Sequence, residues 1–112
     1  VGGVPVVRGA VRVPDMKALQ AMGDALREQL GSGVGVLAAS FDDDKAALLA
    51  VVTDDLRAKG LAADALVKEL AARVGGRGGG KGHMAQAGVP DASSATAALE
   101  HVPTLVRSAV GA

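Results

Sequence analysis

The sequence predicts one α/β domain, in which a small mixed β-sheet of three to four strands packs with about three α-helices. Short apolar runs of strand length, segments with apolar residues every three or four positions, and turn residues between them all predict this class. A chain of 112 residues is long enough for one hydrophobic core. The predicted order over residues 1–112 is β-α-β-β-α-(glycine-rich loop that can include a short strand)-α.

The first strand and first helix are predicted from a change in periodicity. Apolar residues alternate with others from Val4 to Val13, which is typical of a strand. Pro14 ends the strand, and Asp15 is a suitable N-cap for an amphipathic helix that stops at the glycines beginning with Gly31. The residues expected on the buried stripe of this helix are Met16, Leu19, Met22, Leu26 and Leu30.

Two continuous apolar runs, Val34–Phe41 and Ala46–Thr53, are too short for core helices. They are predicted to be two strands of a hairpin, each covered on both faces. The three aspartates Asp42–Asp44 favour a turn between them. A divalent-cation site is the less favoured interpretation of these aspartates, because no second ligand-rich segment is evident.

The second half of the chain predicts two helices around a glycine-rich segment. The first covers Leu61–Val74 and ends at Gly75 in the left-handed conformation. A short strand over Met84–Ala87 follows, and a last helix starts at Asp91–Ser94 and reaches Val110, with a kink at Pro103. The inward residues are expected to be Leu66, Val67, Leu70, Ala71 and Val74 in the first helix and Ala95, Ala98, Leu99, Val102, Leu105 and Val106 in the last.

The composition excludes several classes of site. The chain has no cysteine, so it has no disulfide, thiolate chemistry or cysteine zinc site. Phe41 is its only aromatic residue, so single-stranded bases cannot stack on Phe, Tyr or Trp as they usually do. The net charge is zero, and no apolar run has the length of a membrane span. The sequence begins at Val1 without an initiator methionine, so we expect it to be a piece of a longer chain.

The segment GGRGGGKGHMAQAG, Gly75–Gly88, is the most informative part of the sequence. Glycine is costly to order, so this density indicates either positive φ angles or a backbone that an anion such as a phosphate approaches closely. A flexible linker is the alternative, but the interleaved cations favour the anion interpretation. The spacing nearly matches a nucleotide-binding P-loop, yet Gly82 replaces the required Ser or Thr and a helix precedes it, so we exclude nucleotide hydrolysis.

The sequence offers binding candidates rather than catalytic ones. No serine has an evident histidine and carboxylate partner, so we assign no catalytic residue, no metal ligand and no cofactor to this chain. For His83, contact with a phosphate and a structural hydrogen bond both stay open. The primary phosphate-binding candidates are Gly75, Gly76, Arg77, Gly78, Gly79, Gly80, Lys81, His83 and Gln86, with Arg8 and Arg12 as secondary ones.

GGRGGGKGHMAQAG resembles the glycine-rich signature of the DHH-associated domain at the C-terminus of alanyl-tRNA synthetases. The resemblance covers essentially the whole chain, since four other segments also match the family pattern: Asp15-Met16-Lys17, Leu30-Gly31-Ser32, Val67-Lys68-Glu69 and Asp91-Ala92-Ser93. Two features depart from the pattern. Lys81-Gly82 stands where Arg-Pro is common, and Pro103 lies inside the last helix.

The resemblance implies a tRNA-binding accessory domain of a cytoplasmic alanine–tRNA ligase that helps link aminoacylation with editing. Its partners would be the alanine-accepting tRNA, the upstream domains of the same chain and a second copy in a homodimer. ATP, Mg and Zn would belong only to the upstream domains, and no membrane is expected as a partner. Two alternatives are the substrate-binding domain of a DHH-family phosphoesterase, in which a histidine directly follows the glycines, and a module that serves only dimerisation.

Overall fold

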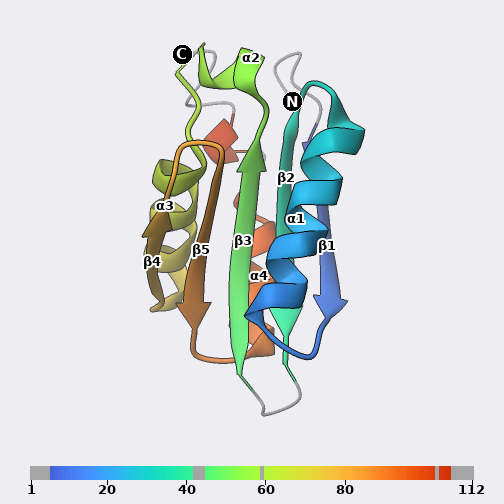
Figure 1. Cartoon of the computed structure of the whole chain (residues 1–112). Coiled ribbons are helices and arrows are strands. Elements are labelled where there is room, and N and C mark those ends of the chain that lie inside the picture. The colour runs from blue at the N-terminus through green and yellow to red at the C-terminus, as the bar shows by residue number, and fades with distance from the viewer. Residues whose placement is uncertain (1–5, 42–44, 59, 103, 107–112) are drawn as a thin grey trace.

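A computed structural model of the chain describes residues 6–41, 45–58, 60–102 and 104–106. These residues form one five-stranded sheet of order β1-β2-β3-β5-β4 with helices on both faces (Figure 1). The elements are β1 (Val6–Arg12), α1 (Met16–Leu30), β2 (Val34–Ser40), β3 (Ala46–Val52), α2 (Asp54–Arg57), α3 (Ala63–Val74), β4 (Arg77–Gly80), β5 (Met84–Val89) and α4 (Ala92–Leu99). β1 is parallel to β2 and the other pairs are antiparallel, so the predicted mixed α/β class is confirmed.

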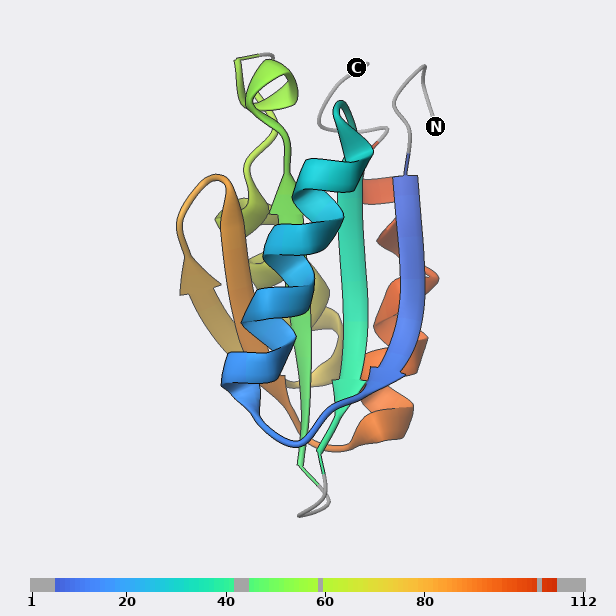
Figure 2. The same cartoon turned by 45° about the vertical axis from the view of Figure 1, so that its right-hand side comes forward.

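The helices divide the core into two layers. α1 connects β1 to β2 and packs on one face of the sheet over β2 and β3, while α3 and α4 cover the other face (Figures 1 and 2). Leu48, Val67 and Leu70 are among the fully buried residues on the α3 and α4 side, and Leu19 and Leu49 lie on the α1 side. Small aliphatic residues fill both layers, as the composition requires. Among the described residues, no helix has the length and apolar character to cross a bilayer.

The first helix begins as predicted, but its buried face is slightly rotated. The Asp15 carboxylate accepts a hydrogen bond of 2.8 Å from the Ala18 backbone N–H, which confirms the N-cap. Leu19 is fully buried, whereas Met22 is 39% exposed, so its expected inward position was wrong. Gly23 is buried instead and lies against Leu49, because α1 approaches the sheet most closely where it has no side chain.

The predicted hairpin of β2 and β3 is confirmed, and the helix α2 between β3 and α3 was not predicted. The Asp55 carboxylate accepts hydrogen bonds from Ser32 Oγ at 2.5 Å and Thr53 Oγ1 at 2.6 Å, which lower the pKa of Asp55. These contacts tie the short α2 to the end of α1. α3 begins at Ala63 rather than at the predicted Leu61. Its end at Gly75, with φ of 79°, is as predicted.

The glycine-rich segment departs most from its prediction as a loop. Arg77–Gly80 form β4, an edge strand that pairs with β5, and this strand raises the count above the expected three to four in the described part of the chain. Edge strands of this kind are difficult to predict because glycine has a low strand propensity. The predicted short strand over Met84–Ala87 is present as β5.

The last helix starts at the predicted place. The Asp91 carboxylate accepts a 2.7 Å hydrogen bond from the Ser94 backbone N–H, and Ala95, Ala98, Val102 and Val106 are buried as expected. The α4 helix ends at Leu99, with further helical turns at residues 102 and 104–106. Several predictions lie outside the described residues: the start of the first strand at Val4, the aspartate turn at 42–44, Pro103, and the helix end at Val110.

The cap at Asp91 gives a testable pH dependence. The Ser94 backbone N–H stabilises the charged carboxylate and lowers the pKa of Asp91 in the folded chain. A lowered folded pKa means that the contribution to stability is complete above the unfolded pKa and is lost as the pH falls below about 5. We expect Asp91→Asn to flatten the decline of unfolding free energy between about pH 5 and pH 3. Urea unfolding at several pH values tests this, and an unchanged decline would contradict it.

Candidate nucleic-acid interface

The glycine-rich segment forms a hairpin with a fixed turn at the edge of the sheet. The Lys81 N–H donates to the Met84 carbonyl at 3.0 Å across a two-residue turn of Gly82 and His83. The Gly82 carbonyl accepts a 2.9 Å hydrogen bond from the Ala63 N–H at the start of α3. The His83 carbonyl accepts a 3.0 Å hydrogen bond from the Val52 N–H at the end of β3. The main chain of the turn is therefore held from two sides.

Three glycines of this segment are required by close packing of β4 on β5. A Cβ atom at Gly78 would overlap the backbone of Ala87 and Gln86, and one at Gly80 would lie 2.9 Å from Ala85 Cα. A Cβ atom at Gly76 would likewise overlap the Gly88 carbonyl. The absence of side chains here lets the two strands approach closely, which is an intramolecular role that the sequence did not reveal.

Gly88 of this segment faces open space, and Gly79 lies against the end of a flexible side chain. Residues directly opposite each other in an antiparallel pair share a face of the sheet, and Gly79 lies opposite Gln86 while Arg77 lies opposite Gly88. An added Cβ atom at Gly88 would meet nothing within 4 Å. At Gly79 its nearest neighbour would be Lys68 Cε at 3.3 Å. Gly88 could therefore accept a side chain, whereas Gly79 could accept one if the end of Lys68 moved away.

The open face of the hairpin lies on the α1 side of the sheet. The Met84 side chain packs with the α1 cluster, and alternation along the strands places Gln86, Arg77, Gly79 and Lys81 on the same side. α1 packs over β2 and β3 and reaches β5 at Met84 and Gln86, so in the described part of the chain no helix covers this face of β4 (Figure 1). We call Arg77, Gly79, Lys81, Gln86 and Gly88 the hairpin surface. Its floor consists of Gly79, Gly88 and the Gln86 side chain, and an exposed cation lies at each end.

A shallow pocket of about 290 Å³ lies on this surface between the hairpin and α1. Gln20 Nε2 donates to Gln86 Oε1 at 2.8 Å within it, which links α1 to β5. The amide pair still offers donors and acceptors to a ligand. Lys81, His83, Met84 and Gly80 also line this pocket.

The main-chain amides are only partly available to an anion. The Gly76 N–H caps α3 by donating to the Ala71 carbonyl at 2.8 Å, and Gly75 forms the left-handed end of that helix. Since Lys81 and Met84 form a hydrogen-bonded pair, alternation directs the N–H of Gly79 toward β5 and those of Gly78 and Gly80 toward the open edge. Of the Gly75–Gly80 amides expected to bind an anion, the N–H groups of Gly78 and Gly80 remain available along the edge of β4.

Arg8 and Arg12, the secondary candidates, do not join this site. Both lie on β1, at the opposite edge of the sheet from β4. Arg8 Nη1 donates to the Leu99 carbonyl at 2.8 Å, so its guanidinium serves the end of α4.

Three residues near the hairpin were not predicted to belong to a site. Lys68 of α3 extends its chain to Gly79, Gln20 of α1 bonds Gln86, and the Arg57 guanidinium lies against Gly82. The only sequence signal for the two cations is the run of positive charges that begins at Arg57 and ends in the glycine segment. Their contacts depend on the packing of distant segments and cannot be read from local patterns.

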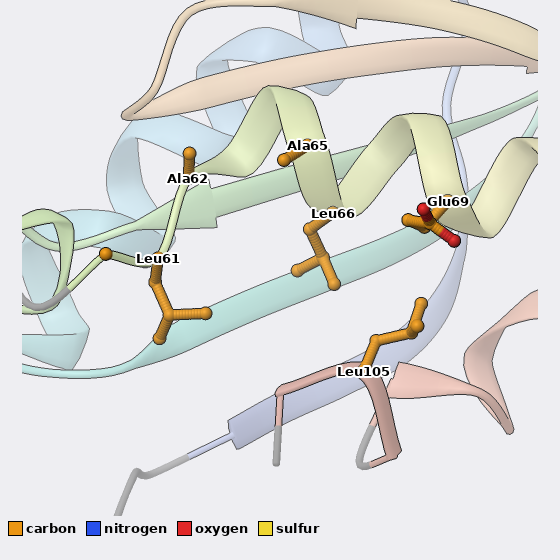
Figure 3. A pocket seen from close by; sticks show the side chains of 7 residues that line it. Leu61, Ala62, Ala65, Leu66, Glu69 and Leu105 are labelled. Carbon is orange, nitrogen blue, oxygen red and sulfur yellow. The ribbon is translucent and has the colours of Figure 1, made fainter. Parts of the chain in front are cut away.

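A second pocket has a different character. A groove of about 360 Å³ lies between α3 and the turn at residues 104–106, and apart from Glu69 its side chains are apolar (Figure 3). The side chains that line it include Leu61, Leu66 and Leu105. Among the described residues that line this groove, Glu69 is the charged one.

Comparison with known proteins gives a consistent family. The DHHA1 domain matches residues 4–108. The alanine–tRNA ligase of Geobacillus thermodenitrificans is 52% identical over 108 residues, a match that covers 96% of this chain and 12% of the relative. The chain thus spans about an eighth of the length of the relatives it matches.

Solved structures show the same fold at lower identity. The C-Ala domain of alanyl-tRNA synthetase from Aquifex aeolicus superposes with a TM-score of 0.81 at 22% identity, covering 99% of this chain and 96% of that one. A DHH-domain protein described as a member of a family of ribosomal proteins gives 0.59 at 17% identity, covering 94% of this chain and 26% of that one. With the family match over nearly its whole length, the chain belongs to the DHHA1 domain family.

Proposed function

We propose that this chain is the tRNA-binding accessory domain of an alanine–tRNA ligase and helps to link aminoacylation with editing on one tRNA. The relatives at about half identity are alanine–tRNA ligases, which supports this parent. The observation that carries the binding role is the hairpin surface, where exposed Arg77 and Lys81 flank a floor made of Gly79, Gly88 and the Gln86 side chain. A phosphate backbone can approach such a floor closely while both cations reach its oxygens.

The chemistry of this surface suits recognition of a folded RNA by shape. With Phe41 as the only aromatic residue, the chain has few means of stacking bases, so binding would use phosphates and sugar hydroxyls. We propose that ATP, Mg and Zn serve upstream domains of the parent rather than this one, and that the parent acts in the cytoplasm with the alanine-accepting tRNA. Binding should be of modest affinity and sensitive to salt.

Removal of both cations tests the surface. We expect Arg77→Ala/Lys81→Ala to weaken binding of an alanine-accepting tRNA transcript by about tenfold to a hundredfold, because two charge-assisted contacts are lost. The slope of log K against log salt should fall in magnitude by about 1.4 to 1.8. Fluorescence anisotropy at several KCl concentrations measures both quantities.

A matched control removes one arginine and one lysine elsewhere. Arg12 is the last residue of β1 and Lys45 directly precedes β3, and both ends lie away from the hairpin turn. Arg12→Ala/Lys45→Ala also removes two positive charges, as Arg77→Ala/Lys81→Ala does. We expect it to bind nearly as well as the parent sequence. Equal affinity losses in the two double variants would indicate bulk charge and would rule out a defined site on the hairpin surface.

Two other functions have some support. The fold is shared with a DHH-domain protein, which is consistent with a substrate-binding domain of a DHH phosphoesterase. The apolar groove beside α3 is consistent with a dimerisation module. Size-exclusion chromatography with and without tRNA distinguishes a dimerisation module from a tRNA-binding domain. A dimer that does not bind tRNA would favour dimerisation alone, and DHH metal motifs upstream in the full-length protein would favour the phosphoesterase.

A further inference from the structure

We propose that Lys68 of α3 is a third cation of the RNA-binding surface and binds a phosphodiester group of the RNA at the open edge of β4. The proposal rests on the proposed RNA-binding function and adds to it a ligand from a helix on the opposite face of the sheet. Lys68 lies outside the glycine-rich segment, and only the fold brings the two together.

The Lys68 side chain passes around the open edge of β4. Gly79 shares a face of the sheet with Gln86, and the hydrogen bond from Gln20 places Gln86 on the α1 face. α3 covers the other face (Figures 1 and 2). An added Cβ atom at Gly79 would nevertheless lie 3.3 Å from Lys68 Cε. Because β4 is the last strand of the sheet, a side chain from α3 can reach Gly79 around its free edge.

The position of Lys68 on α3 agrees with this path. Val67 and Leu70 face the sheet, while Leu66 and Glu69 line the apolar groove on the flank toward residues 104–106. With about 3.6 residues per turn, Lys68 lies on the opposite flank of the helix, beyond β4.

The ammonium group of Lys68 is available to an anion. Lys68 is exposed, and within the described ranges its Nζ has no hydrogen bond or ion pair. Asp64 lies one helical turn earlier, at a spacing that favours an ion pair with Lys68. The lysine extends to Gly79 instead, and its ammonium is one bond beyond the Cε atom that lies there.

The edge of β4 offers main-chain donors beside this ammonium. The N–H groups of Gly78 and Gly80 point to the open edge on either side of Gly79, and both glycines are exposed. Their carbonyl oxygens point the same way and repel an anion, so a cation is needed at this edge. Lys68 supplies that cation, and a phosphate oxygen can accept from its ammonium and from a neighbouring N–H together.

The test measures binding of an alanine-accepting tRNA transcript to the 112-residue chain at several KCl concentrations. Lys68→Ala is expected to weaken binding about tenfold and to reduce the magnitude of the salt slope by about 0.7 to 0.9, because one charge-assisted contact is lost. Lys68→Arg keeps the charge and should restore the slope.

Lys68→Met separates charge from packing. Methionine keeps an unbranched side chain against Gly79 but has no charge, so we expect it to bind tRNA as weakly as Lys68→Ala. If Lys68→Met bound tRNA with the affinity and salt slope of the parent sequence, Lys68 would act only by packing on β4. That result would overturn the proposal.

Arg73→Ala is the matched control for net charge. Arg73 is an exposed cation of the same helix, one turn after Glu69 and therefore on the flank away from β4. Its removal should change the affinity by less than about twofold and leave the salt slope nearly unchanged. Equal losses in Arg73→Ala and Lys68→Ala would indicate bulk charge and would overturn the proposal.

A lysine at a strand edge can also serve to prevent pairing with a strand of another molecule. Size-exclusion chromatography of Lys68→Ala tests this role, and we expect it to elute as the parent sequence does. Self-association of Lys68→Ala without a loss of tRNA affinity would overturn the phosphate contact.

Two outcomes distinguish this inference from the proposed function. Parent affinity of Lys68→Ala together with weak binding of Arg77→Ala/Lys81→Ala would overturn the role of Lys68 alone. If Arg77→Ala/Lys81→Ala and all the Lys68 variants bind tRNA as the parent sequence does, the proposed function itself fails.

Discussion

Gly78→Val is expected to destabilise the domain by about 2 to 4 kcal/mol. The new Cβ atom would overlap the backbone of Ala87 and Gln86 on β5. These atoms belong to a paired strand and cannot rotate away as a side chain can, so β4 must separate from β5. Gly78 has no positive φ, so the effect would come from overlap and not from backbone strain. Urea unfolding monitored by circular dichroism measures the loss.

Gly88→Val is the matched control for this prediction. Gly88 lies on the neighbouring strand of the same hairpin, but nothing lies within 4 Å of its added Cβ atom. We expect its unfolding free energy to change by less than about 0.5 kcal/mol. Because Gly88 belongs to the hairpin surface, the valine should nevertheless weaken tRNA binding. Equal stability losses at the two positions would contradict the packing described for β4.

The parts of the fold that depend on local chemistry could be predicted from the sequence. Asp15 and Asp91 cap their helices as expected, because an N-cap needs only a carboxylate three residues from a free N–H. The β2–β3 hairpin followed from two apolar runs around a polar turn, and Gly75 ends α3 through a conformation that glycine adopts readily.

The parts that depend on long-range packing could not be predicted. β4 has no apolar pattern, and it forms because its glycines fit closely against Ala85 and Ala87. In α1, Gly23 is buried and Met22 is exposed for a similar reason. The helix can approach the sheet closely at Gly23 because glycine has no side chain.

The candidate site also combines residues that a local pattern identifies with residues that only long-range packing brings together. Arg77, Lys81, His83 and Gln86 were identified because they lie in one continuous segment, and the fold does place them around one hairpin. Arg57, Lys68 and Gln20 reach it from three other elements. Arg8 and Arg12 lie at the far edge because the strand order separates β1 from β4 by three strands.

Leu70→Ala is expected to cost about 2 to 5 kcal/mol of unfolding free energy. Leu70 is fully buried on α3, where the helix packs on the sheet, and no aromatic side chain is part of this core to fill the cavity. A loss of this size is a large fraction of the stability of a typical small domain, about 5 to 15 kcal/mol. α3 also carries Lys68 and the Ala63 N–H that holds Gly82, so the hairpin surface should lose order with it.

Two variants distinguish a cavity from a general effect of substitution. Leu70→Met conserves volume and should cost less than about 1.5 kcal/mol. Met22→Ala removes a side chain of similar volume from a position that is 39% exposed, and we expect a loss below about 1 kcal/mol. Urea unfolding measures the loss of unfolding free energy in Leu70→Ala, Leu70→Met and Met22→Ala and so ranks the three losses. If Met22→Ala cost as much as Leu70→Ala, α1 would have to bury Met22 as its periodicity predicts, and the close contact of Gly23 with Leu49 would be wrong.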